Sequence, residues 1–243
     1  MLTACNILLS TNMNSIQKTA RLAGLLYLID AIAGGFGHFS LHGGLIVPGD
    51  ATATVNNIKA SATLLQFGIV SNLVDGIFFI LLPLVLYKLL NHVNKNHAVL
   101  MVVFAVVSVP IACFNMVNQF AALQLANGAD YLKVFDANQL HALVMFFLDL
   151  QSAGVLVAQI FFGLWLLPLG YLVFKSDFLP KVIGVLLIIA CFVYLAGSAI
   201  YFLAPDRVAA IQMMYIEPAV AEMSLCLWLL IKGVKVKSQA AMV

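Results

Sequence analysis

Charged residues are scarce in this chain. Lys, Arg, Asp and Glu make up 9% of the 243 residues, where a soluble domain has about a quarter, and the formal net charge is +2. So small a charge gives no reason to expect nucleic acid as a partner. A hydrophobic content of 63% and a mean hydropathy of +1.06 indicate an integral membrane protein, whose first partner is lipid.

The motifs of several enzyme classes are missing as well. The sequence contains no GxSxG, GxxxxGK[ST], GxGxxG or CxxC pattern, so nucleophilic catalysis and nucleotide binding have no support. The four cysteines, Cys5, Cys113, Cys191 and Cys226, are scattered without paired spacing. We interpret them as small apolar core residues. We expect no cofactor, and an enzyme is not the favoured class.

What the chain does have is long apolar stretches. A transmembrane helix needs roughly 20 apolar residues at about 1.5 Å each, and six stretches meet that need. They lie near residues 20–42, 60–90, 98–125, 140–174, 180–203 and 214–233. Some are longer than necessary, so we expect tilt, or kinks at Pro83, Pro110 and Pro168. The fold class predicted is an all-α membrane bundle of six transmembrane helices.

The same pattern sets the expected domain limits. Residues 1–14 are predicted to be a loosely ordered extension, and Met13 is as sensible a start as Met1. Residues 15–237 form one expected six-helix domain, and residues 238–243 a short tail.

Basic residues predict the orientation. Nine of them fall on one side of the expected membrane: Lys18, Arg21, Lys88, Lys95, Lys175, Lys181, Lys232, Lys235 and Lys237. Lys59, Lys133 and Arg207 fall on the other. Because basic loops stay in the cytoplasm, both termini are predicted to be cytoplasmic.

Four acidic residues interrupt the apolar spans, namely Asp30, Asp75, Asp149 and Glu222. Within the spans, Lys and Arg stand only at the ends, nine or more positions from these acids, at Arg21, Lys88, Lys181 and Lys232. An acid inside a membrane without such a neutralising partner is a functional-site candidate by default. Counted from the cytoplasmic lysines, Asp30, Asp75 and Glu222 lie at heights of roughly 15 to 20 Å in a hydrocarbon core about 30 Å thick. Asp149 lies nearer the outer surface.

Helical periodicity predicts which residues share a face with these acids. Offsets of three, four and seven place small and polar side chains beside each one. Asp30 shares its face with Gly34, Gly37 and His38, Asp75 with Gly68, Ser71 and Asn72, and Asp149 with Ser152, Gln159 and Gly163, while the third span adds Asn115 and Asn118.

Two interpretations of these faces remain open. In one, small residues let helices approach closely and polar groups only hold them together. In the other, the faces line an acidic cavity that binds or moves a proton, a cation or a small cationic or amphiphilic solute, since acids buried near one another exchange protons closer to neutral pH. In that case Asp75 and Glu222 are the expected central pair and Asp30 a third ligand. Further expected ligands are Asp149, Asn72, Asn115 and Asn118.

Two other classes stay possible on the sequence alone. His38 and His42 are one turn apart, and with His141 and Asp149 they make a candidate zinc site of an intramembrane hydrolase. The HExxH pattern fails, because Phe39 stands where it needs Glu. The third class is a non-catalytic assembly or sensor component, whose outer loops near 43–59 and 126–139 would form a charged, solvated rim.

Three segments resemble a known family. They are Ala20-Arg21-Leu22-Ala23-Gly24-Leu25-Leu26-Tyr27, the stretch FFGLWLLPLGYLVFKSDFLPKVIGVLL from Phe161 to Leu187, and Ile216-Glu217-Pro218 with Trp228-Leu229-Leu230-Ile231-Lys232-Gly233. The chain from residue 14 to 237 resembles the bacterial multi-pass membrane proteins called domain of unknown function 4386. The resemblance implies a bacterial plasma-membrane protein with one six-helix domain. It implies no activity and no site residues.

Overall fold

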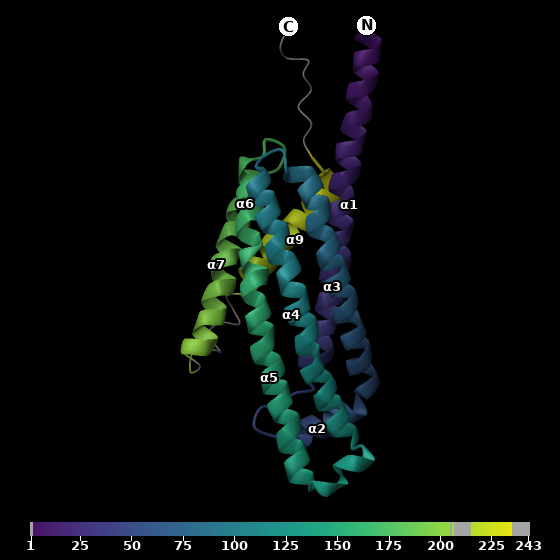
Figure 1. The fold of residues 1–243 in the computed structure, drawn as a ribbon, viewed down its shortest axis with the longest axis vertical. Coiled ribbons are helices and arrows are strands. Elements are labelled where there is room, and N and C mark those ends of the chain that lie inside the picture. Colours follow the sequence, from purple (N-terminus) through teal and green to yellow (C-terminus); the bar gives the residue numbers. More distant parts are fainter. Residues whose placement is uncertain (1, 205, 207–214, 235–243) are drawn as a thin grey trace. The chain divides into compact units, whose positions relative to one another are not determined.

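All the regular secondary structure of the described residues is helical. The computed structural model describes residues 2–204, 206 and 215–234, with side chains from residue 14, and this part contains no strand. Figure 1 labels most of the elements. In order they are α1 (Leu2–His42), α2 (Ala51–Ala60), α3 (Ala62–Leu90), α4 (Lys95–Asn127), the 3₁₀ helix η1 (Asp130–Val134), α5 (Ala137–Leu164), α6 (Leu166–Lys175), α7 (Lys181–Leu203), α9 (Ile216–Leu227) and the π-helix η4 (Trp228–Lys232). The all-α prediction is confirmed.

Five helical stretches are long and apolar enough to cross a membrane. They are Asn14–His42, Ala62–Leu90, Lys95–Asn127, Ala137–Lys175 and Lys181–Leu203. These match the first five predicted spans. The predicted sixth span corresponds to α9, which has 12 residues and continues directly into the five-residue η4. The count of six therefore stays a prediction, and Arg207, Lys235 and Lys237, used to orient the chain, lie outside the described residues.

The surface supports a membrane location. Many of the largest apolar side chains are exposed, among them Phe114 at 80%, Ile32 at 64% and Phe67 at 63%. Soluble proteins rarely expose apolar surface on this scale, because water penalises it. Together with the five long helices, this surface indicates that hydrocarbon surrounds the chain.

Kinks were expected at three prolines, and the helix is interrupted near only one of them. α3 and α4 continue through Pro83 and Pro110. The helix is interrupted at Trp165, between α5 and α6. Pro168 has no N–H to donate to the carbonyl four residues before it, at Leu164, so the hydrogen-bond ladder has a gap there.

The described helices form two compact units. Unit 1 comprises Met1–Leu28, Phe79–Val107 and Gln159–Val243, and unit 2 comprises Ile29–Phe78 and Ser108–Ala158. Four helices, α1, α3, α4 and α5, contribute one part to each unit. The organisation of residues 15–237 as a single domain stays a prediction.

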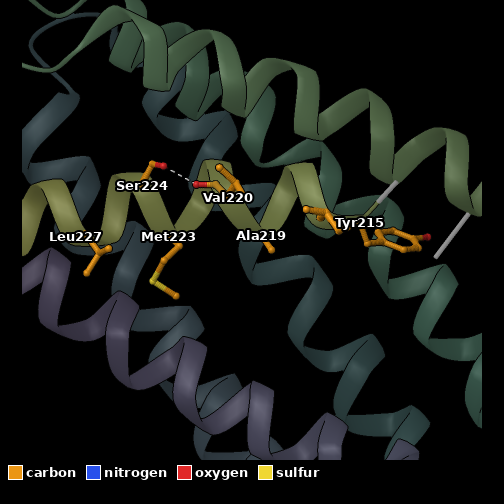
Figure 2. Close-up of a pocket in the computed structure, with 7 residues that line it drawn as sticks. Tyr215, Ala219, Val220, Met223, Ser224 and Leu227 are labelled. Carbon is orange, nitrogen blue, oxygen red and sulfur yellow. Dashed lines mark hydrogen bonds between the residues drawn. The ribbon is translucent and has the colours of Figure 1, made fainter. Parts of the chain in front are cut away.

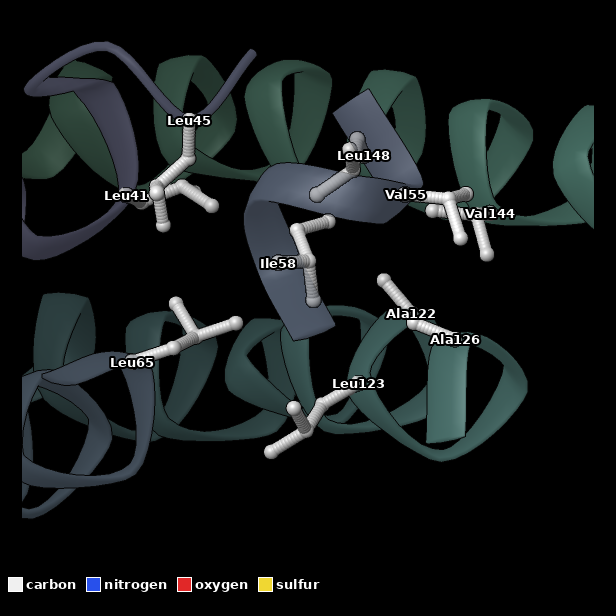
Figure 3. Packing of buried hydrophobic residues seen from close by; sticks show 10 residues of the cluster. All are labelled: Leu41, Leu45, Val55, Ile58, Leu65, Ala122, Leu123, Ala126, Val144 and Leu148. Atoms are coloured by element: carbon white, nitrogen blue, oxygen red, sulfur yellow. The ribbon is translucent and has the colours of Figure 1, made fainter. Parts of the chain in front are cut away.

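Unit 2 has its hydrophobic core around α2. Val55 and Ile58 of α2 are almost completely buried, and Figure 3 shows them among side chains from α1, α3, α4 and α5. The cluster consists of Leu41, Leu45, Val55, Ile58, Leu65, Ala122, Leu123, Ala126, Val144 and Leu148. The Asp50 carboxylate caps α2 by accepting a hydrogen bond of 2.8 Å from the Ala53 N–H. The segment interpreted from sequence as a long outer loop is thus largely an amphipathic helix.

Unit 1 has an aromatic core around Trp165, which is 1% exposed. The Trp165 ring lies 5.1 Å from Phe79 and 6.1 Å from Tyr27, centroid to centroid. Elsewhere in the unit, helices approach through glycines. A Cβ placed on Gly170 would lie 2.7 Å from the carbonyl oxygen of Gly184, so α6 and α7 pack backbone against backbone.

The end of η4 is tied to α1 within unit 1. Gln17 Nε2 donates a hydrogen bond of 3.0 Å to the Lys232 carbonyl, and Gln17 Oε1 accepts one of 3.0 Å from the Val234 N–H. Gly233 between them has a φ of +63°, which favours glycine. Further along, a Cβ on Gly24 would lie 2.6 Å from the Leu230 nitrogen. The η4 backbone therefore lies directly against α1.

Candidate functional site

Two of the predicted acids meet in unit 2. Asp30 of α1 is 8% exposed, Asp75 of α3 is half-buried, and their carboxyl groups share a hydrogen bond. An ionised carboxylate can only accept hydrogen bonds, so a bond between two carboxyl groups requires a proton on one of them. Two acids this close are suited to holding one proton between them, because like charges side by side disfavour a second ionisation.

Glycines on α1 make room for this pair. A Cβ on Gly34 would lie 2.9 Å from Asp75 Oδ1, and a Cβ on Gly37 would overlap the Asn72 side chain. The Ser71 hydroxyl donates a hydrogen bond of 2.8 Å to the Ala33 carbonyl. The small and polar faces that periodicity predicts for the first two spans thus face each other.

The two predicted asparagines of α4 have partners on α4 and α5. Asn115 is 6% exposed, and its Nδ2 donates a hydrogen bond of 2.8 Å to the Gln151 carbonyl on α5. Asn118 Nδ2 donates one of 2.9 Å to Asn115 Oδ1. Gly154 leaves the space that the Asn115 amide fills. These amides link α4 to α5, and their role as ligands stays a prediction.

Glu222 belongs to unit 1 and is held by two tyrosines. Tyr27 Oη donates a hydrogen bond of 2.6 Å to Glu222 Oε2, and Tyr194 Oη donates one of 3.0 Å to Oε1. Each carboxylate oxygen therefore has its own donor, an arrangement that suits an ionised group. The predicted pairing of Glu222 with Asp75 joins residues of different units and stays a prediction.

Sequence reasoning did not identify Tyr27 as a site residue. Tyr27 entered the sequence analysis only as part of the family resemblance. The available signal was the position of Tyr27 one turn before Asp30 on a small-residue face. That signal does not identify the partner, because Tyr27 and Glu222 are 195 positions apart in the chain.

Asp149 stands apart from these groups. Its side chain is exposed on α5, and it belongs neither to the carboxyl pair nor to the amides of Asn115 and Asn118. The structure therefore brings together two of the four acids predicted to bound a cavity. It places a third in unit 1 and leaves the fourth on the surface.

The histidines do not assemble a metal site in the described structure. The rings of His38 and His42 stack with their centroids 4.4 Å apart, and His141 Nδ1 lies 3.1 Å from the Thr52 hydroxyl. Across residues 2–204, 206 and 215–234, no three His, Cys, Asp or Glu side chains gather as a metal ion would require. This gives no support to the hydrolase hypothesis built on His38, His42, His141 and Asp149.

Comparison with known proteins gives a family and no activity. The family model described as "Domain of unknown function (DUF4386)" matches residues 22–233. No curated protein and no solved structure matches the chain.

Proposed function

We propose the following function for this chain, which belongs to the DUF4386 family: it is a multi-pass membrane protein that binds a proton or a small cation at the Asp30–Asp75 pair and moves it across the membrane. The observation that supports this proposal is the hydrogen bond between two carboxyl groups on apolar helices. Acids placed inside a bilayer are costly and typically belong to ion pathways or proton relays.

The Asp30–Asp75 pair has the chemistry to bind and release a proton or a cation. With one proton it carries a single negative charge, and a second proton or a cation would neutralise it. A small cation would find carboxylate oxygens from two helices, which are the hard ligands such ions prefer. Asn72, one turn from Asp75 on the same face of α3, adds an amide to the surroundings of the site.

The proposal is tested with the double variant Asp30→Asn/Asp75→Asn in proteoliposomes. Asparagine keeps the size and hydrogen-bonding capacity of the pair but cannot hold an exchangeable proton. We expect proton uptake, followed with an entrapped pH-sensitive dye during an imposed pH gradient, to fall at least tenfold. Asp149→Asn, which neutralises an exposed acid of the same unit, should leave uptake within twofold of the wild type.

Thermal stability in detergent separates this proposal from a purely structural role. If the double variant loses stability while wild-type protein shows no proton or cation flux, the acids only hold α1 and α3 together. The chain then fits the class of non-catalytic membrane components. Unchanged flux in a stable double variant would refute the site assignment.

We further propose six spans, with both termini in the cytoplasm of a bacterial plasma membrane. In support, α9 and η4 together rise about 25 Å at about 1.5 Å per residue, close to the hydrocarbon thickness of a bilayer. A fluorescent protein fused after Val243 should therefore fluoresce, because it folds in the cytoplasm. Alkaline phosphatase inserted at Asp130 should be active. An active phosphatase at the C-terminus would contradict this topology.

A further inference from the structure

The exposed groove along α9 in unit 1 is apolar. Figure 2 shows Met223 and Leu227, two of its lining residues, on one side of the helix. The Ser224 hydroxyl there already donates a hydrogen bond of 2.6 Å to the Val220 carbonyl. A helix surface of this kind suits contact with lipid. The polar groups that call for a ligand lie inside unit 2.

Two glutamines inside unit 2 have amide atoms without a hydrogen-bond partner among the described residues. Gln119 of α4 is 1% exposed, and both its Oε1 and its Nε2 belong to these atoms. Gln151 of α5 is 6% exposed, and its Oε1 is the third. Burying an amide without a hydrogen bond is costly, and an internal water molecule is the usual partner of a buried polar group that no protein atom satisfies.

The helices α3 and α4 run antiparallel within unit 2, and two contacts define their register. Gly76 follows Asp75 directly, and a Cβ on it would lie 3.2 Å from Val109 Cγ1. At the α2 end, Leu65 and Leu123 belong to one buried cluster, as Figure 3 shows. The α3 residues between Leu65 and Asp75 are therefore level with the α4 residues between Leu123 and Val109.

Gln119 lies within this stretch and on the buried face of α4. It is four positions from Asn115 and four from Leu123, and both of these side chains are buried. On α5, the Gln151 carbonyl accepts the hydrogen bond from Asn115 Nδ2, and a Cβ on Gly154 would overlap the Asn115 side chain. Both glutamines thus lie on buried helix faces between the carboxyl pair and the α2 cluster.

The three amide atoms include a donor and two acceptors. Gln119 Nε2 carries two N–H groups, and Gln119 Oε1 and Gln151 Oε1 accept hydrogen bonds. A cation would satisfy only the oxygens, and an anion would satisfy only the N–H groups. Water both donates and accepts, and it needs two to four polar partners. The chemistry of the two side chains therefore selects water.

We propose that Gln119 and Gln151 bind internal water molecules that pass protons to and from the Asp30–Asp75 pair. Gln119 is level with a residue about seven positions before Asp75 on α3, which is about 10 Å along the helix. Three or four water molecules at about 2.8 Å each span this distance. Each accepts one proton and releases another, so the chain is restored after a transfer. The relay rests on the proposed function, whereas the water site does not.

X-ray radiolysis of the full-length protein in detergent tests the water site, because hydroxyl radicals formed from bound water oxidise methionines beside it. Met116 is three positions from Gln119 on the same face of α4, and Met101 of the same helix is completely buried in unit 1. We expect Met116 to be oxidised at least fivefold faster than Met101. Gln119→Leu should slow the oxidation of Met116 at least threefold, and Gln119→Glu, which still binds water, should keep it within twofold.

Proton uptake in proteoliposomes tests the relay. The double variant Gln119→Leu/Gln151→Leu removes the three amide atoms and keeps side chains of similar size. We expect uptake to fall at least tenfold while thermal stability in detergent is retained, because leucine fills the space without requiring a hydrogen bond. Gln66→Leu replaces an exposed glutamine of unit 2 and is the matched control. It should leave uptake within twofold of the wild type and the oxidation of Met116 unchanged.

The outcomes separate the water site from the relay. Equal oxidation of Met116 and Met101, or unchanged oxidation of Met116 in Gln119→Leu, would overturn the water site. If Gln119→Leu does not fold, Gln151→Leu takes its place in both tests. Wild-type uptake in a folded variant that has lost the oxidation of Met116 would overturn the relay. A wild type without proton uptake would refute the proposed function and the relay with it, and the oxidation rates would still decide the water site.

Discussion

Replacing Glu222 by alanine is expected to lower the free energy of unfolding by about 2–4 kcal/mol. The change removes the acceptor of two hydrogen bonds, from Tyr27 at 2.6 Å and from Tyr194 at 3.0 Å. Hydrogen bonds to charged groups contribute about 1.5–3 kcal/mol each, although pairs inside membranes often contribute less. The loss can be measured in mixed micelles by titrating a denaturing detergent. Asp149→Ala removes an exposed acid and should change stability by less than about 0.5 kcal/mol.

A double-mutant cycle identifies the cause of this loss. Tyr27→Phe removes one donor and should cost about 1–2 kcal/mol in the wild-type background. In the Glu222→Ala background the same change should cost almost nothing, because the hydroxyl has already lost its acceptor. An equal cost in both backgrounds would mean that the Tyr27 hydroxyl contributes through a group other than Glu222, because phenylalanine retains the ring contact with Trp165.

Replacing Gly37 by leucine is expected to abolish function at the Asp30–Asp75 pair. Even a Cβ at this position would overlap the Asn72 side chain, so α1 and α3 have to move apart. Inserting bulk into a tightly packed contact costs about 1–3 kcal/mol, and the hydrogen bond between the carboxyl groups would be lost with it. We expect proton uptake in proteoliposomes to fall at least tenfold.

Gly35→Leu is the matched control for this change. Gly35 is exposed on the same helix, and a Cβ there has no neighbour within 4 Å. Uptake should therefore stay within twofold of the wild type. A second change, Asn72→Ala, should partly restore uptake to Gly37→Leu, since it removes the overlapping side chain. Normal uptake by Gly37→Leu alone would show that close packing of α1 on α3 is unnecessary.

Composition and periodicity predicted the features that depend on neighbours along one helix. The first five spans follow from the lengths of the apolar stretches, and the glycines four and seven positions after Asp30 indicate the face of α1 that packs on α3, although Asp75 was predicted to pair with Glu222. Such offsets identify a helix face, and two faces of small residues pack closely.

Features that depend on distant residues or on backbone detail did not follow from the pattern. Periodicity describes the faces of one helix at a time. It cannot predict which tyrosines contact Glu222, because Tyr27 and Tyr194 lie on other helices. It placed Asp149 in a cavity because its polar neighbours suggested an inward face, whereas its side chain is exposed. The helix α2 was missed because its ten residues are too short and too polar for a span, and they gain their stability by burying Val55 and Ile58.

The two hydrogen bonds that Gln17 makes with Lys232 and Val234 determine which end of the last helix could move in a transport cycle. A side-chain amide that bonds a carbonyl on one side of a glycine and an N–H on the other acts as a fixed anchor. If α9 and η4 shift during turnover, their Lys232 end is then the pivot, and the opposite end, at Tyr215, moves farthest. Engineers adding labels to report such motion should accordingly place them near Tyr215, where displacement would be greatest.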